Sequence, residues 1–217
     1  MRLRIIGDVH GNIKKYLEIV EDANAQGLHT LQIGDLGFYP EYQFLFNYKS
    51  FDKDKNKCFM GNHDCYTLAE EAKSSFCLGD YGPATLNGVS FFFVRGAFSI
   101  DQFRRTHGID WWPEEELPLS EFDKIAESYL KCKPDIVISH DCPHSIGNDE
   151  ILKEEGVLEH YKFNPNTFTT NTSALLQQLF SLHQPQFWYF GHYHKNWTNT
   201  VRGTKFRCLA ELSYIDI

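Results

Sequence analysis

Five short segments of the chain carry the residue types that bind metal ions and transfer protons. Each begins with glycine or serine and contains aspartate, histidine or asparagine. In chain order they are Gly7–His10, Gly34-Asp35, Gly61–Asp64, Ser139-His140 and Gly191–His194. Together they offer enough nitrogen and oxygen donors for two metal ions, and two-metal sites are typical of phosphoryl chemistry.

Apolar runs that read as buried strands precede four of these five segments. The runs are Leu3–Ile6, Leu31–Ile33, Ile136–Ile138 and Phe187–Phe190. A strand that ends in a tight turn delivers the following side chains to one edge of a sheet, where α/β proteins build their sites. We therefore expect the segments to converge at one sheet edge.

Spacing within two of the segments also fits a metal site. Asp8 and His10 are separated by one residue, as are His192 and His194, and alternate residues of an extended segment face the same way. Three other candidates each have a plainer explanation when taken alone. Asp35 reads as a turn residue, Asn62 as part of an Asx turn, and His140 as a hydrogen-bonded structural histidine. A common metal centre explains all five segments at once, so we expect one.

Composition describes an acidic globular chain. Its 217 residues suffice for one domain with a substantial core, 42% of them are hydrophobic, and the formal net charge is -8. The acidic balance argues against extended nucleic acid as a partner, because such binding needs a basic surface. No secretory signal, membrane-spanning stretch or C-x-x-C pair is visible, so we expect a cytoplasmic protein with reduced thiols and no membrane partner.

Apolar periodicity predicts alternating strands and helices, followed by hairpins. Strands are expected over 2–6, 29–33, 57–60, 89–94, 134–138 and 187–190, and helices over 13–25, 67–73, 120–131 and 172–183. Ser120 is the expected cap of the third helix, Asn87-Gly88 the turn of one hairpin, and Gly203 the turn of another within 197–215. This order predicts an α/β fold with mixed sheets and helices outside them.

Two segments, 96–118 and 141–170, lack clear periodicity. Loops this long in a compact domain are often functional, and both lie near the metal motifs. We assign them to the substrate rim of a single domain that spans 1–217. Within the first, Trp111 and Trp112 either stack on a ring of the substrate or pack on the core, and packing is the preferred interpretation.

These motifs resemble those of the calcineurin-like metallophosphoesterase superfamily, in particular its small bacterial and phage-type members. The shared pattern is D-x-H, G-D, G-N-H-D/E, a lone H and G-H-x-H, and here it spans residues 7–194. The resemblance implies a four-layer αββα sandwich with a binuclear metal centre at the sheet edge. It implies that Asp35 bridges both ions, with Asp8, His10 and His194 on one ion and Asn62, His140 and His192 on the other.

The resemblance also implies a reaction. A hydroxide that bridges the two ions would attack phosphorus in line, while His63 acts as the catalytic histidine beside Asn62 and assists the leaving oxygen. Nitrogen and oxygen donors without thiolate favour Mn²⁺, with Fe, Zn²⁺ or Ni²⁺ as alternatives. The prediction is a metal-dependent phosphoesterase that hydrolyses a small phosphodiester or phosphomonoester, nucleotides included.

The chain departs from the Ser/Thr protein phosphatases of that superfamily, which extend the second motif to G-D-x-x-D-R-G. Here Gly34–Tyr39 reads G-D-L-G-F-Y, so the phosphate-binding arginine is absent at that position. Arg95, Arg104 and Arg105 are candidate replacements, although each alone reads as a solvated charge. Two alternatives stay open: a nuclease of the same superfamily, and a non-catalytic metal-binding scaffold or interaction protein. No oligomeric state is predicted.

Overall fold

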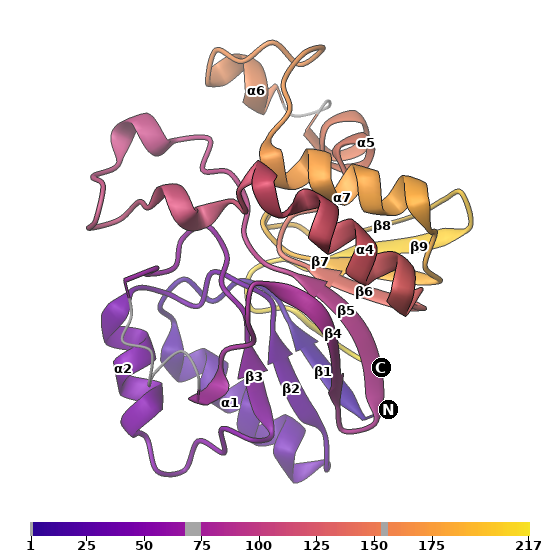
Figure 1. Ribbon diagram of the computed structural model, residues 1–217. Helices are drawn as coiled ribbons and strands as arrows, with labels where there is room; N and C mark the ends of the chain where they lie inside the picture. Colours follow the sequence, from indigo (N-terminus) through magenta and orange to yellow (C-terminus); the bar gives the residue numbers. More distant parts are fainter. Residues whose placement is uncertain (1, 68–74, 153–155) are drawn as a thin grey trace.

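Helices cover the outer faces of two β-sheets that pack against each other (Figure 1). The computed structural model describes residues 2–67, 75–152 and 156–217. The layer order is helix, sheet, sheet, helix, which confirms the predicted αββα architecture. The predicted helix over 67–73 falls almost entirely outside the described residues.

The first sheet has the strand order β10-β1-β2-β3. Strands β1 (Leu3–Ile6), β2 (His29–Gln32) and β3 (Asn56–Cys58) are parallel, and β10 (Tyr214–Asp216) is antiparallel to β1. Helices α1 (Ile13–Ala25) and α2 (Tyr39–Asn47) cover its outer face, where Tyr16, Val20 and Leu45 are buried in one apolar cluster. The Asn12 side chain caps α1 by accepting a hydrogen bond from the Lys15 amide.

The second sheet has the order β4-β5-β6-β7-β9-β8. Its parallel centre consists of β5 (Val89–Val94), β6 (Ile136–Ser139), β7 (Phe187–Phe190) and β9 (Thr204–Cys208). The edge strands β4 (Tyr81–Leu86) and β8 (Trp197–Val201) are antiparallel to their neighbours. Helices α4 (Phe122–Cys132) and α7 (Asn171–Leu182) lie over its outer face.

Alternate side chains of β5 pack on opposite faces of its sheet, in two different apolar clusters. Phe91 and Phe93 join the cluster between the sheets, which also contains Ile5 and Leu31 of the first sheet. Phe92 and Val94 belong to the cluster beneath α4 and α7. Because successive side chains of a strand point to opposite faces, the continuous apolar run of β5 buries both faces of its sheet.

One sequence expectation needs correction, one is confirmed and one helix was missed. Ser120 is not a helix cap: it lies in a 3-10 turn, η3 (Leu119–Glu121), and α4 begins afterwards at Phe122 without a side-chain cap. The predicted hairpin with Gly203 at its turn is confirmed, because β8 and β9 pair antiparallel there, and beyond it β10 returns to the first sheet. Helix α2 was not expected; a proline in its first turn and its aromatic residues conceal the helical period.

Short helical turns fill the two aperiodic segments, which lie at the same end of the molecule (Figure 1). The first contains η1 (Gln102–Arg104) and η2 (Pro113–Glu115), and the second α5 (His144–Ile146), the π-helical η4 (Gly147–Leu152) and α6 (Val157–His160). Trp112 is buried with its ring centroid 6.2 Å from that of Phe38, and Trp111 packs edge-on against His107. Both tryptophans therefore have packing partners within the fold.

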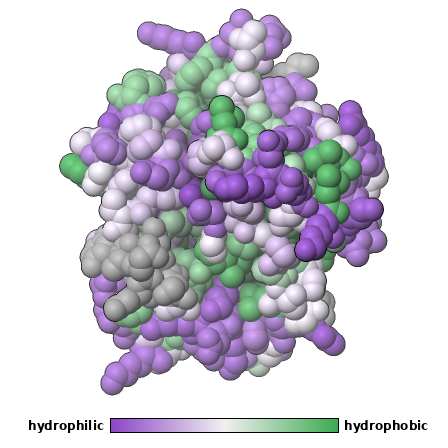
Figure 2. All heavy atoms as spheres, in the orientation of Figure 1, coloured by the Kyte–Doolittle hydropathy of each residue, from purple (hydrophilic) through white to green (hydrophobic). Residues whose placement is uncertain are grey.

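The surface carries mixed polar and apolar groups. Hydrophilic atoms cover most of the face in Figure 2, and apolar atoms form separate small groups on it. Within the described part of the chain, no helix combines the length and the apolar character needed to cross a membrane.

Candidate metal centre

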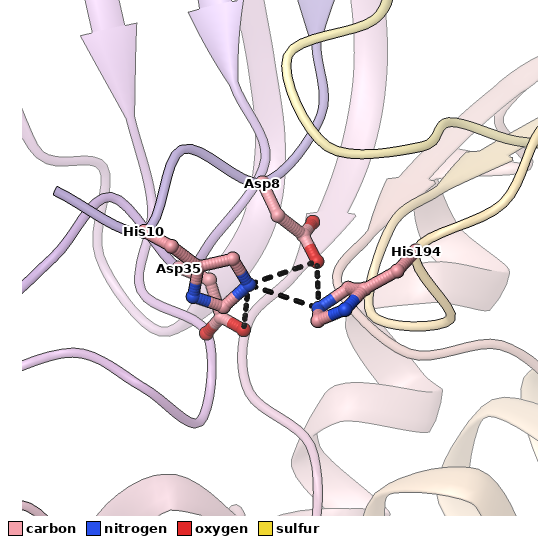
Figure 3. Close-up of side chains that lie close together, drawn as sticks. All are labelled: Asp8, His10, Asp35 and His194. Carbon is pink, nitrogen blue, oxygen red and sulfur yellow. Dashed lines mark hydrogen bonds and ion pairs between the residues drawn. The ribbon is translucent and has the colours of Figure 1, made fainter. Parts of the chain in front are cut away.

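Four side chains from three strand ends form the first donor set (Figure 3). Asp8 and His10 follow β1, Asp35 follows β2, and His194 follows β7. Their donor atoms all lie within 4.8 Å of one another. The Nε2 atoms of His10 and His194 are 2.9 Å apart, and His194 Nε2 is 3.2 Å from Asp8 Oδ2. Segments 184 residues apart in the chain thus meet at one point.

A second donor set lies on the other side of Asp35. Asn62 Oδ1 is 3.1 Å from His140 Nε2 and 3.1 Å from His192 Nδ1. Asp35 Oδ1 is 3.3 Å from His140 Nε2, whereas Asp35 Oδ2 lies 3.8 Å from His10 in the first set. One carboxylate thus faces both sets, the position that the resemblance implied for a bridging ligand.

The chemistry of these donors fits bound cations. Asp8 and Asp35 are fully buried, and Asp35 Oδ2 lacks a hydrogen-bond partner among the described residues. A buried carboxylate oxygen without a partner is costly, and a cation would remove that cost. Ligands that each lie about 2.1 Å from one ion are themselves about 3–3.5 Å apart, which matches the closest separations here.

Backbone conformation at the ligands is unusual. His10, Asp35, His192 and His194 have φ values of 46°, 57°, 67° and 51°. Residues other than glycine rarely adopt this left-handed region, and clusters of such residues mark functional sites. The turns after β1, β2 and β7 therefore position these candidate donors at some conformational cost.

The glycines that precede the ligands allow the close approach of neighbouring donors. A Cβ atom at Gly61 would collide with the Asp35 side chain and backbone and with the His140 ring. A Cβ atom at Gly34 would also strike the His140 ring, and Gly34 has a φ of +105°. Both positions require glycine for the donor sets to assemble.

The Asp64 carboxylate connects two of the ligand-bearing turns. It accepts hydrogen bonds from the backbone amides of Asp35 at 2.8 Å, Gly37 at 3.0 Å and Gly61 at 2.6 Å. Burial and the nearby Asp35 charge raise the pKa of Asp64 to about 7, against the opposing effect of these amides. Sequence reasoning gave Asp64 no role, although its place directly after His63 was a signal.

A hydrogen-bonded chain sets the orientation of the Asn62 amide. The Ser99 hydroxyl and amide both donate to the buried Glu115 carboxylate, at 2.6 and 2.8 Å. The Ser99 oxygen is 3.0 Å from Asn62 Nδ2, which donates to it. Asn62 Oδ1 is thereby turned toward His140 and His192. Partners of this kind, one step behind a ligand, commonly tune metal affinity.

A backbone carbonyl orients the His140 ring, and a neighbouring carboxylate favours its protonated form. Its Nδ1 donates to the Ile33 carbonyl at 2.8 Å, which leaves Nε2 facing the donor set. Burial alone would lower the pKa of His140, but the Asp35 carboxylate outweighs it and raises that pKa to about 10. The same contact holds the pKa of Asp35 below its ordinary value despite burial. A metal ion at Nε2 must therefore displace a proton, as is usual for histidine ligands.

His63 stands beside the donor sets rather than within them. Its backbone amide donates to Asp35 Oδ1 at 2.7 Å, and its ring centroid is 5.3 Å from that of His10. His63 Nε2 is 3.2 Å from Arg105 Nη2, and because arginine can only donate, Nε2 accepts. Burial and the charges of Arg105 and His10 lower the pKa of His63, so its ring is neutral at neutral pH.

The three candidate arginines have different surroundings. Arg105 forms a two-pronged ion pair with Asp101, at 2.7 and 2.9 Å, and lines the cavity described below. Arg95 is buried, ion-paired with Asp80, and donates to the Glu114 carbonyl. Arg104 is exposed and lies over the rings of Phe103 and Tyr161. Of the three, Arg105 is brought to the donor sets.

A cavity of about 450 Å³ adjoins the donor sets. His10, Asn62, His63, His192 and His194 lie along one part of its wall. Both aperiodic segments contribute further wall residues, among them Ile100 and Tyr161. The metal donors are therefore reachable from a space large enough for a small organic molecule.

Comparisons with known proteins show what the chain resembles in sequence and in fold. The family model described as calcineurin-like phosphoesterase matches residues 1–196. A solved structure of a proposed 5′-nucleotidase from Staphylococcus aureus superposes with a TM-score of 0.54 at 14% identity, covering 96% of this chain and 48% of that one. This chain thus spans about half the length of that protein, and the similarity is one of fold.

Two further solved structures share lower similarity. An archaeal phosphodiesterase has a TM-score of 0.43 at 13% identity, with coverage of 97% of this chain and 84% of that one. The phosphopantetheinyl hydrolase of Mycobacterium tuberculosis has a TM-score of 0.47 at 13% identity, with coverage of 97% and 89%. No curated protein matches the chain.

Proposed function

The chain belongs to the calcineurin-like phosphoesterase family, and from that premise we propose that it is a binuclear metal-dependent hydrolase of small phosphate esters. The observation that carries the proposal is the sharing of Asp35 between two donor sets beside a cavity. Mn²⁺ is the first candidate for both ions, since the donors are nitrogen and oxygen without thiolate. The ions would be held by Asp8, His10, Asp35, Asn62, His140, His192 and His194.

Bound at these donors, divalent ions supply an activated water as nucleophile and positive charge for the phosphoryl oxygens. The protein prepares the donors in advance. The Ile33 carbonyl fixes the His140 ring, and the Ser99 hydroxyl fixes the Asn62 amide. Preorganised groups of this kind need no rearrangement during the reaction, which is how enzymes lower barriers electrostatically.

Arg105 is the residue that we assign to the substrate phosphate. Asp101 holds its guanidinium from one side, and Nη2 reaches toward His63 at the cavity wall. The planar fork of arginine matches the spacing of phosphate oxygens. A phosphate group bound at this part of the cavity wall would therefore contact both the Arg105 guanidinium and the His63 ring.

His63 is the group that we assign to the leaving oxygen. Burial and the Arg105 charge keep its pKa low while the site holds no anion. A bound phosphate adds negative charge next to the ring and offsets the Arg105 charge, so the pKa of His63 rises. A proton at Nε2 then becomes available for the departing oxygen.

Activity measurements on reconstituted protein test these assignments. Metal-depleted protein with excess Mn²⁺ is expected to hydrolyse 4-nitrophenyl phosphate, bis(4-nitrophenyl) phosphate or both. His63→Ala should keep its metal content and lose about 100-fold or more in kcat, whereas Asp35→Asn should lose metal. Arg105→Ala should lower kcat/KM at least about tenfold, because a charge-assisted phosphate contact is removed. Arg104→Ala is the matched control and should leave kcat/KM unchanged.

Other outcomes would favour other functions. Fully metal-loaded protein that hydrolyses neither ester would point to a scaffold. Cleavage of single-stranded DNA in preference to both esters, with binding that weakens steeply as salt rises, would point to a nuclease. Full activity of His63→Ala on an ester with a poor leaving group would remove His63 from the mechanism.

A further inference from the structure

Two chemically different kinds of side chain line the cavity beside the donor sets. Polar ones include the candidate metal donors, His63 and Arg105, as well as Asn148, Thr170 and Ser173. The others are apolar and stay partly exposed in the free protein. These apolar wall residues are Phe98, Ile100, Leu152, Val157, Tyr161 and Phe168.

Aromatic contacts fix the position of two of these apolar wall residues, Phe98 and Phe168. The Phe98 ring packs edge-on against Phe168, with centroids 5.9 Å apart, and against Phe163 at 6.2 Å. Phe163 and Phe168 are 4.6 Å apart. Asn148 donates to the Phe168 carbonyl at 2.7 Å, which ties the backbone of that residue to the turn at η4. The rings therefore stand ready before any ligand arrives.

Both rim segments build this wall together. Phe98 and Ile100 come from the first segment, and Leu152, Tyr161 and Phe168 from the second. The segments also meet where Phe103 packs against Tyr161, with their ring centroids 6.3 Å apart. An apolar wall assembled from two separate segments and left partly exposed next to a polar site is suited to cover part of a ligand.

We propose that these apolar wall residues bind an aromatic ring in the organic part of the phosphate ester, with Phe98, Tyr161 and Phe168 as the rings that contact it. Aromatic rings gain from edge-to-face contacts with other rings beyond the gain from burial alone, which favours a flat ring over an alkyl group. The head-group assignment rests on the proposed function, whereas the ring subsite rests on the cavity wall. Substrates would then be aryl or nucleoside phosphates, in preference to glycerol or short-chain alkyl phosphates.

Binding of stable phosphonates isolates the subsite from catalysis. Isothermal titration of Mn²⁺-loaded protein would compare phenylphosphonate, cyclohexylphosphonate and methylphosphonate, which share one head group. Burial of a phenyl group is expected to make phenylphosphonate at least about tenfold tighter than methylphosphonate. Cyclohexylphosphonate should bind measurably more weakly than phenylphosphonate, because it lacks ring-to-ring contacts.

Variants then locate the subsite on the wall. Phe168→Ala should reduce the ratio of phenylphosphonate affinity to methylphosphonate affinity to below about threefold, while the methylphosphonate affinity itself stays the same. Phe168→Leu keeps an apolar side chain and should give an intermediate ratio, and it serves if the alanine variant fails to fold. Phe44→Ala, at an exposed position on α2, is the control and should keep the wild-type ratio.

The outcomes separate the two proposals. Equal affinities for phenylphosphonate and methylphosphonate would overturn the ring subsite even if the protein hydrolyses phosphate esters. Equal affinities for phenylphosphonate and cyclohexylphosphonate would overturn its aromatic preference. Selective binding of phenylphosphonate by a protein that hydrolyses no ester would support the subsite and overturn the proposed hydrolase. If no phosphonate binds, both proposals fail.

Discussion

Glu115 lies two hydrogen bonds away from Asn62, a proposed metal ligand, and its burial gives it an unusual ionisation. The side chain is 2% exposed, and burial raises the pKa of Glu115 to about 7 although the Ser99 hydrogen bonds oppose this. Glutamate in the unfolded chain has a pKa near 4.5. Between these two values the folded protein binds more protons than the unfolded one, so Glu115 makes stability fall as pH rises.

We predict that the stabilising contribution of Glu115 to the unfolding free energy is fully present below about pH 4.5 and is lost as pH rises through about 7. From about pH 5.5 to about pH 8 the loss should be roughly 2 kcal/mol, at about 1.4 kcal/mol for each pH unit over which the proton is lost. Urea unfolding of wild-type and Glu115→Gln protein at both pH values measures it. The glutamine variant cannot titrate, so the difference between the two proteins isolates Glu115; a difference that does not change with pH would refute the prediction.

Turns at strand ends are the elements that make the centre, and their geometry depends on small residues. Gly61→Ala would push a methyl group into the Asp35 side chain and the His140 ring. We predict a loss of about 2–3 kcal/mol in unfolding free energy and weaker Mn²⁺ binding, because overpacking displaces the Asp35 carboxylate, the proposed bridging ligand. Gly79→Ala is the control: its Cβ meets open space, and the change should stay within about 0.5 kcal/mol. Denaturant unfolding and Mn²⁺ titration of both variants provide the readouts, and equal behaviour would contradict the role given to Gly61.

Local patterns predicted the strands and turns that hold the donors, since an apolar run followed by glycine is visible in any window of sequence. The helix over Ile13–Ala25 and the strand over Phe187–Phe190 have the predicted bounds. The partners behind the donors were not predictable in this way. His140 is oriented by the carbonyl of Ile33, 107 residues away, and Asn62 by Ser99, 37 residues away. Such pairs become neighbours through the packing of two sheets, which leaves no periodic trace.

The residues of the cavity wall were likewise not predictable from local sequence patterns. For the adjacent tryptophans, packing on the core was preferred over ring stacking, and Trp112 is buried against the core. The rings that do line the cavity, Phe98, Tyr161 and Phe168, are scattered through two segments without periodicity. Their common position depends on how the segments fold over the sheet edge, and a single sequence does not encode that in its spacing.

For the whole molecule, the centre joins the two sheets. Asp8, Asp35 and Asn62 follow strands of the first sheet, and His140 and His192 follow strands of the second. Ions held by both groups would resist separation of the sheets and bind the folded state alone.

We therefore predict that metal removal lowers the thermal midpoint. At an Mn²⁺ concentration about 1,000 times the dissociation constant, binding stabilises the fold by about 4 kcal/mol. For a chain of this size that corresponds to roughly 10 °C. Scanning calorimetry with and without chelator measures the shift. Asp35→Asn should show little response to Mn²⁺, and a wild-type midpoint that is indifferent to chelator would contradict the prediction.

The left-handed backbones of His10, Asp35, His192 and His194 have an evolutionary consequence. Each such conformation costs a side-chain-bearing residue about 1 kcal/mol or more, a cost that glycine avoids. Selection for stability alone would therefore replace these four residues with glycine, whereas selection for metal binding retains them. A descendant freed from its chemistry should lose its ligands at these turns first and become more stable as it does so.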